Sequence, residues 1–486
     1  MLSVLIVKEL KGMISSPRFV ATFAICSILM LLSVYIGINE YHESVKQYQT
    51  TQQLIDQQLR EESNWSHLNG VAQREPNPLQ IFAGGINYDL GRMSAISGDE
   101  SVNLKKPHYS DNPVYAVFRI IDFTFIAKFI LTLFAILFTY NAVNGERERG
   151  TLQLLFSNSI PRAKYLIAKC AGSWLGLVVP LSIPVLLCLL MIMAFKVPLS
   201  LSHWGQIIMI ILSSLLLFTF FIVLGVLIST LTRRSNISFL ISLVVWVVLV
   251  LIIPRAGVLA AGQLVEVPRV AEIEGQRDAF AKDKWGQYHI DMEERWKERG
   301  GGTSCGGGDP HEDEEVWGWI QEEDAARKQV EKEIESFDMK LREDLRRRKA
   351  ARIRLAGTLA RFSPASAYQL TTMALAETDI FLKSRYEDSM NSYRTQFVDY
   401  VDQQAANSGP GGGHIMISMS SEDGFSMTSG ADAGALDISG LPQYIVPVSN
   451  FAEIVAQTVI DFGLLCLYIM MAFAGAFISF LRYDIR

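Results

Sequence analysis

One short stretch of the chain begins like a zinc site. The run from His311 to Glu315 opens with the His-Glu pair of the zinc-peptidase helix motif, in which a second histidine four residues later completes the site. Glu315 occupies that fourth position, so one of the two histidine ligands is missing. We therefore expect no zinc peptidase, and a membrane-anchored hydrolase is the weakest of the candidate functions.

A second stretch offers soft metal ligands. His414, Met416, Met419 and Met427 lie in a region rich in Gly and Ser, and imidazole and thioether groups suit copper. The same composition is typical of a flexible loop, so a loop without metal is the favoured interpretation. We predict no catalytic residue and no metal site on this chain.

No phosphate-binding loop of the form G-x-x-x-x-G-K-S/T occurs in the sequence. Such a loop holds nucleotide phosphates with its backbone amides and its lysine, so the chain cannot hydrolyse ATP through a P-loop of its own. No basic patch for nucleic acid is evident either. We expect no cofactor on this chain, and any ATP and magnesium must be bound by another protein.

The composition indicates a membrane protein. Half of the 486 residues are hydrophobic and the mean hydropathy is +0.22, more than an ordinary soluble domain carries. A helix needs about 20 apolar residues to cross a hydrocarbon core of about 30 Å. An all-α polytopic protein in a lipid bilayer is therefore predicted, with six transmembrane helices at 19–38, 123–143, 170–195, 207–232, 235–254 and 459–481.

Charged residues are rare in these six segments. Lys128, the one basic residue within them, lies near the predicted outer end of the second segment. A lysine in that place can extend its ammonium group to the membrane surface, and we favour this interpretation over a role in transport. Asp461 lies at the edge of the last segment.

Lysines and arginines beside the spans predict the orientation, because cytoplasmic flanks are enriched in them. With six spans, four basic groups fall on one side, while the short loop 197–206 on the other side has none. Both termini are therefore expected in the cytoplasm. The four groups are Lys8, Lys11 and Arg18; Arg147, Arg149, Arg162, Lys164 and Lys169; Arg233 and Arg234; and Arg482 and Arg486.

Two long segments, 39–122 and 255–458, then lie on the outer side. In the second, apolar residues recur largely at three- and four-residue steps, which is the pattern of amphipathic helices. We expect a large, mainly helical extracytoplasmic domain, able to dock a periplasmic or envelope partner. Its helices are indicated by Val270, Ile273 and Phe280; by Val316, Ile320, Val330, Ile334, Phe337, Leu341 and Leu345; and by Tyr386, Met390, Tyr393, Phe397 and Val401.

The segment 144–169 joins two apolar runs through a short charged stretch. Gly150 breaks the charged run 146–149, Thr151 can cap a new helical turn, and Leu152 and Leu155 give that turn an apolar side. Such a helix can lie on the membrane face and insert into a groove of a soluble partner. A solvated turn would explain the basic residues, but neither the interleaved glutamates nor the leucines.

The same segment resembles the E-x-E-x-G-T-L signature, with a following arginine, of the permease subunits of type 2 ABC exporters. In that family the stretch docks on a separate ATPase subunit. The resemblance therefore implies a cytoplasmic coupling loop at 144–169, with ATPase-coupling roles for Glu146, Arg147, Glu148, Arg149, Gly150, Thr151, Leu152, Leu155, Pro161 and Arg162.

The N-terminus supports this resemblance. Residues 4–18 are similar to the basic amphipathic helix that lies along the inner membrane surface in these permeases, so 1–18 is predicted as an interfacial helix with Lys8, Glu9, Lys11 and Arg18. The large outer segments, including Leu359–Asp379, resemble a bacterial subgroup with enlarged extracytoplasmic regions. This implies the bacterial inner membrane.

Two functions from different classes follow from the resemblance. The first is a permease subunit of an ATP-driven exporter, not itself an enzyme, acting with an ABC ATPase and a second identical or homologous permease. The second is a mechanotransmission subunit, which passes the motion of the ATPase to an envelope partner without transporting anything.

Overall fold

The computed structural model describes residues 2–62, 65, 68–97, 102, 104–107, 121–157, 161–298, 314–407, 416–420, 424–428, 436, 438–447 and 450–482. The chain divides into two compact units. Unit 1 consists of Met1–Pro254 and Arg361–Arg486, and unit 2 consists of Arg255–Ala360. His311 of the incomplete zinc motif and His414 of the copper candidates lie outside the described residues.

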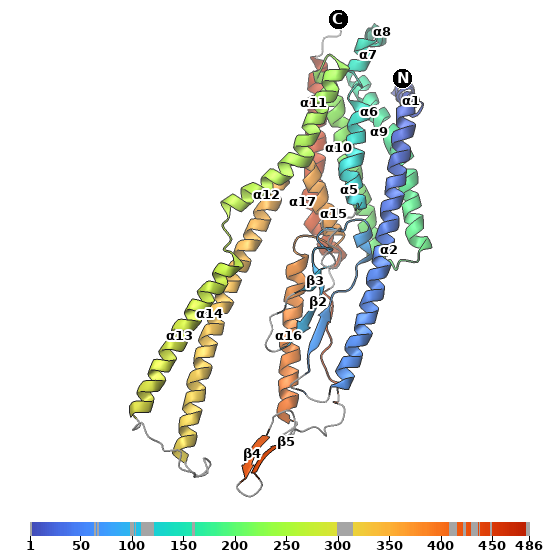
Figure 1. Cartoon of the computed structure of the whole chain (residues 1–486). Coiled ribbons are helices and arrows are strands. Elements are labelled where there is room, and N and C mark those ends of the chain that lie inside the picture. Colours follow the sequence, from blue (N-terminus) through green and yellow to red (C-terminus); the bar gives the residue numbers. More distant parts are fainter. Residues whose placement is uncertain are drawn as a thin grey trace. The chain divides into compact units, whose positions relative to one another are not determined.

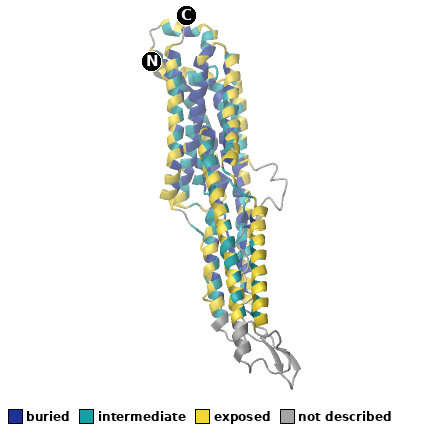
Figure 2. Cartoon of the chain, turned by 90° about the vertical axis from the view of Figure 1, so that its left-hand side faces the viewer, coloured by how far each residue is buried: buried dark blue, intermediate teal, exposed yellow. Residues whose placement is uncertain are grey.

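Six helical segments of the described chain are long and apolar enough to cross a membrane, which confirms the predicted fold class. In unit 1 the most buried of them, α10 (Leu201–Leu231), packs against α6, α9, α11 and α17. Buried residues line the inside of this bundle, and exposed residues cover its outward faces (Figure 2). The other five segments are α2 (Pro17–Glu61); α5 (Phe123–Phe125), η3 (Ile126–Leu131), α6 (Thr132–Thr139) and α7 (Asn144–Glu148); α9 (Arg162–Ala194); α11 (Ser235–Val247), η4 (Val248–Ile252) and α12 (Ile253–Leu264); and α17 (Phe451–Leu481).

Capping residues fix where the spanning helices begin. Ser16 accepts a hydrogen bond from the amide of Phe19 and is followed by Pro17, a strong start signal for α2. At the start of α10, Ser200 and His203 form a capping box. Helix α2 then continues unbroken to Glu61, far beyond the predicted span 19–38, because the Gln-rich stretch that follows also favours helix.

Two of the spanning segments contain a π-helical turn, at η3 and η4. Such a turn disturbs the regular helical hydrogen bonds, and in η4 the carbonyl of Leu249 accepts a hydrogen bond from the Ser363 hydroxyl. In η3, Lys128 is only 8 % exposed, and its Nζ donates to Oε1 of Gln369 at 2.7 Å. The prediction that Lys128 reaches the membrane surface is therefore wrong, because an amide inside the bundle binds its ammonium group.

Helix α15 (Pro364–Leu375), which belongs to the segment 255–458 predicted as the outer domain, packs inside unit 1 against α10, α17 and η4. Its fully buried Tyr368 has its hydroxyl 3.0 Å from the hydroxyl of Ser214. Just before α15, Arg361 binds Asp461 of α17 through two hydrogen bonds, the longer of 3.1 Å. The carboxylate of Asp461 is thus neutralised from within the bundle.

A small antiparallel sheet, which the sequence analysis did not predict, follows α2 in the order β1-β2-β3. Helix α16 (Leu382–Asn407) covers it, with Met390 and Phe397 buried against Ala72 and Ile96. This confirms the predicted apolar stripe of that helix. The strands are β1 (Gly70–Gln73), β2 (Gly91–Ile96) and β3 (Lys105–Pro107), and the helical turn η2 (Pro78–Ile81) lies between the first two.

A separate pair of antiparallel strands is formed by β4 (Met416–Ser420) and β5 (Gly424–Thr428). These two strands contain the three methionines of the copper candidates.

Unit 2 contains two long helices that run side by side, α13 (Val270–Glu298) and α14 (Glu314–Ala360) (Figure 1). The rings of Phe280 and Phe337 stack at 4.1 Å between centroids. One helical turn further, Lys284 binds Glu333 at 2.8 Å. These contacts confirm the two amphipathic helices that the apolar pattern predicted.

The stability of the sheet depends on the ring of Phe397, which is 1 % exposed and lies against Gly70 in β1. We predict that Phe397→Ala costs about 3–5 kcal/mol, because it empties a fully buried ring volume. The measurement is hydrogen exchange of the β1 amides, which should lose protection. Ile290→Ala, at a side chain that is 60 % exposed on α13, serves as the control and should change nothing.

Candidate functional site

The residues assigned to coupling lie at one end of unit 1. Helices α7 and α8 (Thr151–Ser157), the helix α1 (Leu2–Ile14) and the last residue of α17, Leu481, lie at this end (Figure 1). Helix α9 begins here as well, at Arg162. The loop 144–169 is therefore built from two short helices and the first turns of a spanning helix.

Glu146 is the centre of an ion cluster in this region. Its Oε1 lies 2.9 Å from Nζ of Lys169 and 3.3 Å from Nζ of Lys8, and its Oε2 accepts a hydrogen bond of 2.5 Å from Tyr165. Lys169 also binds Glu9 of α1 at 2.6 Å. The Glu146 side chain is only 12 % exposed and that of Lys169 only 5 %. The cluster therefore joins α1, α7 and α9 through charges that are largely withdrawn from water.

Glu148 makes a different connection, to the first residue of α11. Its two carboxylate oxygens accept hydrogen bonds from the backbone amide of Ser235 at 2.8 Å and from its hydroxyl at 2.6 Å. The N-cap residue of α11, Arg234, makes no side-chain hydrogen bond to the start of its helix. Glu148 of α7 accepts from the first amide of α11 instead. A carboxylate at a helix N-terminus also interacts favourably with the helix dipole.

Asn144, which the sequence analysis did not single out, ties α7 to the end of α10. The residue is fully buried, and its Nδ2 donates to Thr232 at 3.1 Å, while its Oδ1 accepts from Ser229 at the same distance. The Ser229 hydroxyl also accepts from the amide of Val143 at 2.9 Å. In the sequence, the signal for this role is a polar residue at the end of an apolar segment. A polar side chain that is buried there must find hydrogen-bond partners.

Gly150 separates α7 from α8 with a left-handed backbone, at φ 72°. A side chain is disfavoured in this conformation even where there is space, so a glycine is the suitable residue here. Thr151 follows, and its hydroxyl donates to the carbonyl of Glu146 at 3.1 Å. The turn thereby fixes the direction in which α8 leaves α7.

Helix α8 has a buried side and an exposed side. Leu152 is 1 % exposed, and the ring of Phe156 lies 5.4 Å from Tyr165 and 6.0 Å from Phe480 of α17, centroid to centroid. Leu155 is partly buried against the same cluster. Leu154 in contrast is 69 % exposed. The structure thus places Leu152 and Leu155 in the interior, and Leu154 is the leucine that remains on the surface.

Helix α1 packs closely on α9 through two glycines of α9. A Cβ at Gly172 would lie 2.7 Å from Cβ of Glu9, and a Cβ at Gly176 would lie 3.3 Å from the sulfur of Met13. Lys8 and Lys11 are exposed on α1. Arg18, which was predicted in the interfacial helix 1–18, instead lies in the first turn of α2, because the turn at Ser15 and Ser16 ends α1.

The remaining predicted residues lie at the edge of the site. Pro161 is exposed and immediately precedes α9, and the Arg162 guanidinium donates to the carbonyl of Leu481 at the end of α17. Arg147 is half-buried and Arg149 is exposed beside Gly150. In the described part of the chain no group of three His, Cys, Asp or Glu side chains is placed to hold a metal ion.

We predict that Glu146→Gln loosens this end of unit 1. Removing the carboxylate charge leaves Lys169 with Glu9 as its remaining acidic partner, at a cost of about 3 kcal/mol for a broken, largely buried ion pair. The thermal unfolding temperature of the purified protein should fall. Glu294→Gln, at an exposed glutamate of α13, is the control, and an equal effect of both variants would contradict the role of the cluster.

Comparison with known proteins gives the family of the chain. The family model described as ABC-2 family transporter protein matches residues 3–485, nearly the whole length. No curated protein matches the chain. With six membrane-spanning helices and a match of this extent, the chain belongs to the ABC-2 transporter family, as a multi-pass membrane permease component.

Proposed function

We propose that this chain is the permease subunit of an ATP-driven exporter and that its loop 144–169 docks on a separate ABC ATPase, which binds ATP and magnesium. The observation that carries the proposal is Leu154, an apolar side chain that is 69 % exposed on a helix whose opposite side is fixed in the protein. An exposed leucine on a helix whose other side is buried suits the groove of a soluble partner.

The buried contacts favour docking over a solvated turn. The enrichment of Lys and Arg in cytoplasmic loops would explain a solvated basic turn. It would explain neither the ion cluster around Glu146 nor the burial of Leu152. Both stiffen the base of α8, so that a force applied at Leu154 and Arg149 reaches the bundle. We therefore assign Glu146 to positioning, and direct contact to Arg149, Gln153 and Leu154, which are exposed.

The contacts of α7 provide the route for that force. Glu146 connects it to α1 and α9, Glu148 to the start of α11, and Asn144 to the end of α10. A displacement of α7 and α8 by the ATPase would then shift the ends of several spanning helices together. This is how closure of a nucleotide-bound ATPase dimer would act on the permease.

The proposal includes an orientation and a second permease. The basic residues at this end of unit 1 support a cytoplasmic position for it and for both termini, and the proposed membrane is the bacterial inner membrane. Helix α9 presents exposed apolar side chains such as Val179, Ile183, Leu186 and Leu190, which suit lipid or a second permease, identical or homologous.

One observation favours the mechanotransmission alternative. Helix α2 is a single helix of 45 residues, about 68 Å long at 1.5 Å per residue, of which the bilayer needs only about 20 residues. It packs against η2, with Gly37 close to Ile81, and against β1. A continuous helix from the spanning region to the sheet is suited to pass motion to an envelope partner.

We predict that Leu154→Glu releases the ATPase. The side chain is exposed, so the fold should be retained, while a carboxylate in an apolar groove costs several kcal/mol of binding free energy. Co-purification with a co-expressed ABC ATPase that binds the wild-type chain measures the effect, and Leu154→Met is the matched control. Unchanged co-purification and unchanged ATPase activity of Leu154→Glu would refute the docking assignment.

A structure of the assembled complex distinguishes the two functions. Export requires a cavity or lateral opening between permeases in at least one nucleotide state, whereas mechanotransmission predicts a sealed membrane region in both states. Electron microscopy with and without a non-hydrolysable ATP analogue is the measurement. A sealed interior in both states would rule out export.

A further inference from the structure

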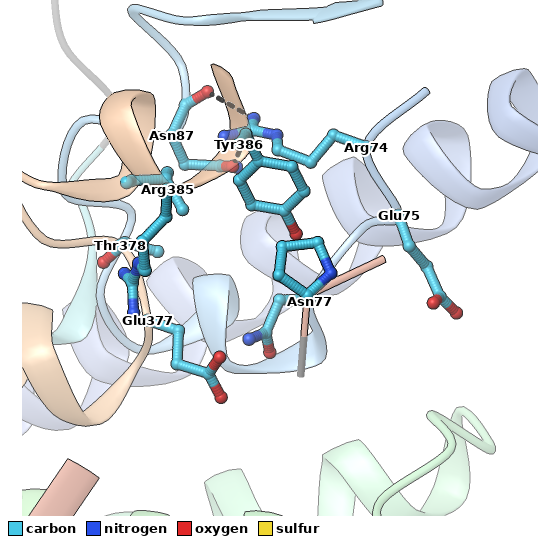
Figure 3. A pocket seen from close by; sticks show the side chains of 10 residues that line it. Arg74, Glu75, Asn77, Asn87, Glu377, Thr378, Arg385 and Tyr386 are labelled. Atoms are coloured by element: carbon cyan, nitrogen blue, oxygen red, sulfur yellow. Dashed lines mark hydrogen bonds between the residues drawn. The ribbon is translucent and has the colours of Figure 1, made fainter. Parts of the chain in front are cut away.

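A small pocket in unit 1 is built from segments far apart in the sequence. Its walls come from the loop after β1, the turn after η2, the turn after α15, the start of α16 and the stretch before α17 (Figure 3). The lining residues are Arg74, Glu75, Asn77, Asn87, Glu377, Thr378, Leu382, Arg385, Tyr386 and Pro447.

Arg74 places a positive charge in the wall of this pocket without a negative partner. The residue is 3 % exposed, and its Nη2 donates to the Asn87 backbone carbonyl at 3.1 Å and to Asn87 Oδ1 at 2.7 Å. Its Nη1 is buried with no hydrogen-bond partner, and no acidic side chain of the described chain forms an ion pair with it. Burial lowers the pKa of Arg74 to about 10, so the group is still charged at neutral pH. An unpaired buried charge costs several kcal/mol, and a bound anion would remove that cost.

The acids of the pocket are turned away from this charge. Figure 3 shows the carboxylates of Glu75 and Glu377 directed away from the guanidinium of Arg74, beyond the ring of Tyr386. Glu377 accepts a hydrogen bond from Gln206 at 3.3 Å, and Arg385 is bound to Asp379 at 2.7 Å. Neither of these two carboxylates therefore pairs with the guanidinium of Arg74.

The backbone around the pocket is held in a strained and closely packed form. Glu377 has a left-handed backbone at φ 55°, which is unusual for a residue with a side chain. Gly85 has φ 53°, and a Cβ there would lie 2.2 Å from the carbonyl oxygen of Thr378. The hydroxyl of Thr378 in turn donates to the carbonyl of Ala83 at 2.9 Å. Strain of this kind persists where the surrounding structure enforces it, and it is common at ligand sites.

Tyr386 supplies a donor at the pocket. Its ring lies 5.6 Å from the Arg74 guanidinium and covers it, and its hydroxyl points into the pocket (Figure 3). Burial raises the pKa of Tyr386 to about 12, so the hydroxyl keeps its proton and can donate at neutral pH. The hydroxyl therefore presents a hydrogen-bond donor to the pocket, at the far end of the ring from the Arg74 guanidinium (Figure 3).

We propose that this pocket binds a singly charged oxyanion, a carboxylate or a phosphodiester group. The anion accepts from the Tyr386 hydroxyl and lies in the field of Arg74, whose charge has no acidic partner in the pocket wall. Glu75 and Glu377 at the pocket disfavour groups of higher negative charge. This site is separate from the coupling loop and does not depend on the ATPase proposal.

The test uses the full chain, purified in neutral detergent, with acetate and dimethyl phosphate as free probes and chloride at equal ionic strength as the reference. We expect both probes to raise the thermal unfolding temperature, and Arg74→Gln to weaken their binding about tenfold or more. Tyr386→Phe, which removes only the hydroxyl, should also weaken binding, and it keeps the test valid if Arg74→Gln does not fold. Lys383→Gln, at an exposed cation nearby on α16, should bind as the wild type does.

A second arm distinguishes the source of the anion. In nanodiscs of phosphatidylcholine without free probe, stabilisation by added phosphatidylglycerol that disappears in the Arg74 and Tyr386 variants identifies a lipid headgroup. Stabilisation by the free probes without any effect of the lipid identifies a soluble ligand. The proposal is overturned if neither source stabilises the wild type, or if the folded Arg74 and Tyr386 variants respond as the wild type does.

Discussion

The ion pair between Glu146 and Lys169 is the interaction on which the end of unit 1 that contains α7 and α8 depends. Both side chains are largely withdrawn from water, so each charge needs the other, and the pair holds α7 to α9. Glu9 binds the same lysine and brings in α1, which fits closely because α9 has Gly172 at the contact. A short charged loop thereby becomes a rigid part of the bundle instead of a solvated connection.

The same constraint explains the polar residues deeper in unit 1. A charge or a free carbonyl within the spanning region has no water to bind, so it must find a partner inside the protein. Arg361 donates hydrogen bonds to Asp461, and Lys128 donates one to the side-chain amide of Gln369. The hydroxyl of Ser363 donates to a backbone carbonyl in the π-helical turn η4. These contacts all involve α15 or the residues just before it, and they hold this helix in the core of the bundle.

For the loop 144–169, the sequence predicted the short helix after Gly150 but not the position of each side chain. The pattern of glutamates and leucines marked the loop correctly as more than a turn. The direction of each side chain depends on the bend at Gly150 and on the packing of α8 against Phe480, neither of which can be read from neighbouring residues. Glu146 therefore became an internal link, Leu152 a core residue and Leu154 the exposed one.

The sequence by itself determined the six spanning helices and the amphipathic stripes of α13, α14 and α16, because hydrophobic length and helical period are local properties of the chain. Only the tertiary structure decided the sheet of three short strands, the inward position of α15 and the pocket at Arg74. Strands of three to six residues and a helix rich in Ala, Ser and Thr carry weak local signals. The pocket joins residues about 300 positions apart, and its unpaired charge exists only because the fold keeps every carboxylate of the described chain out of contact with Arg74.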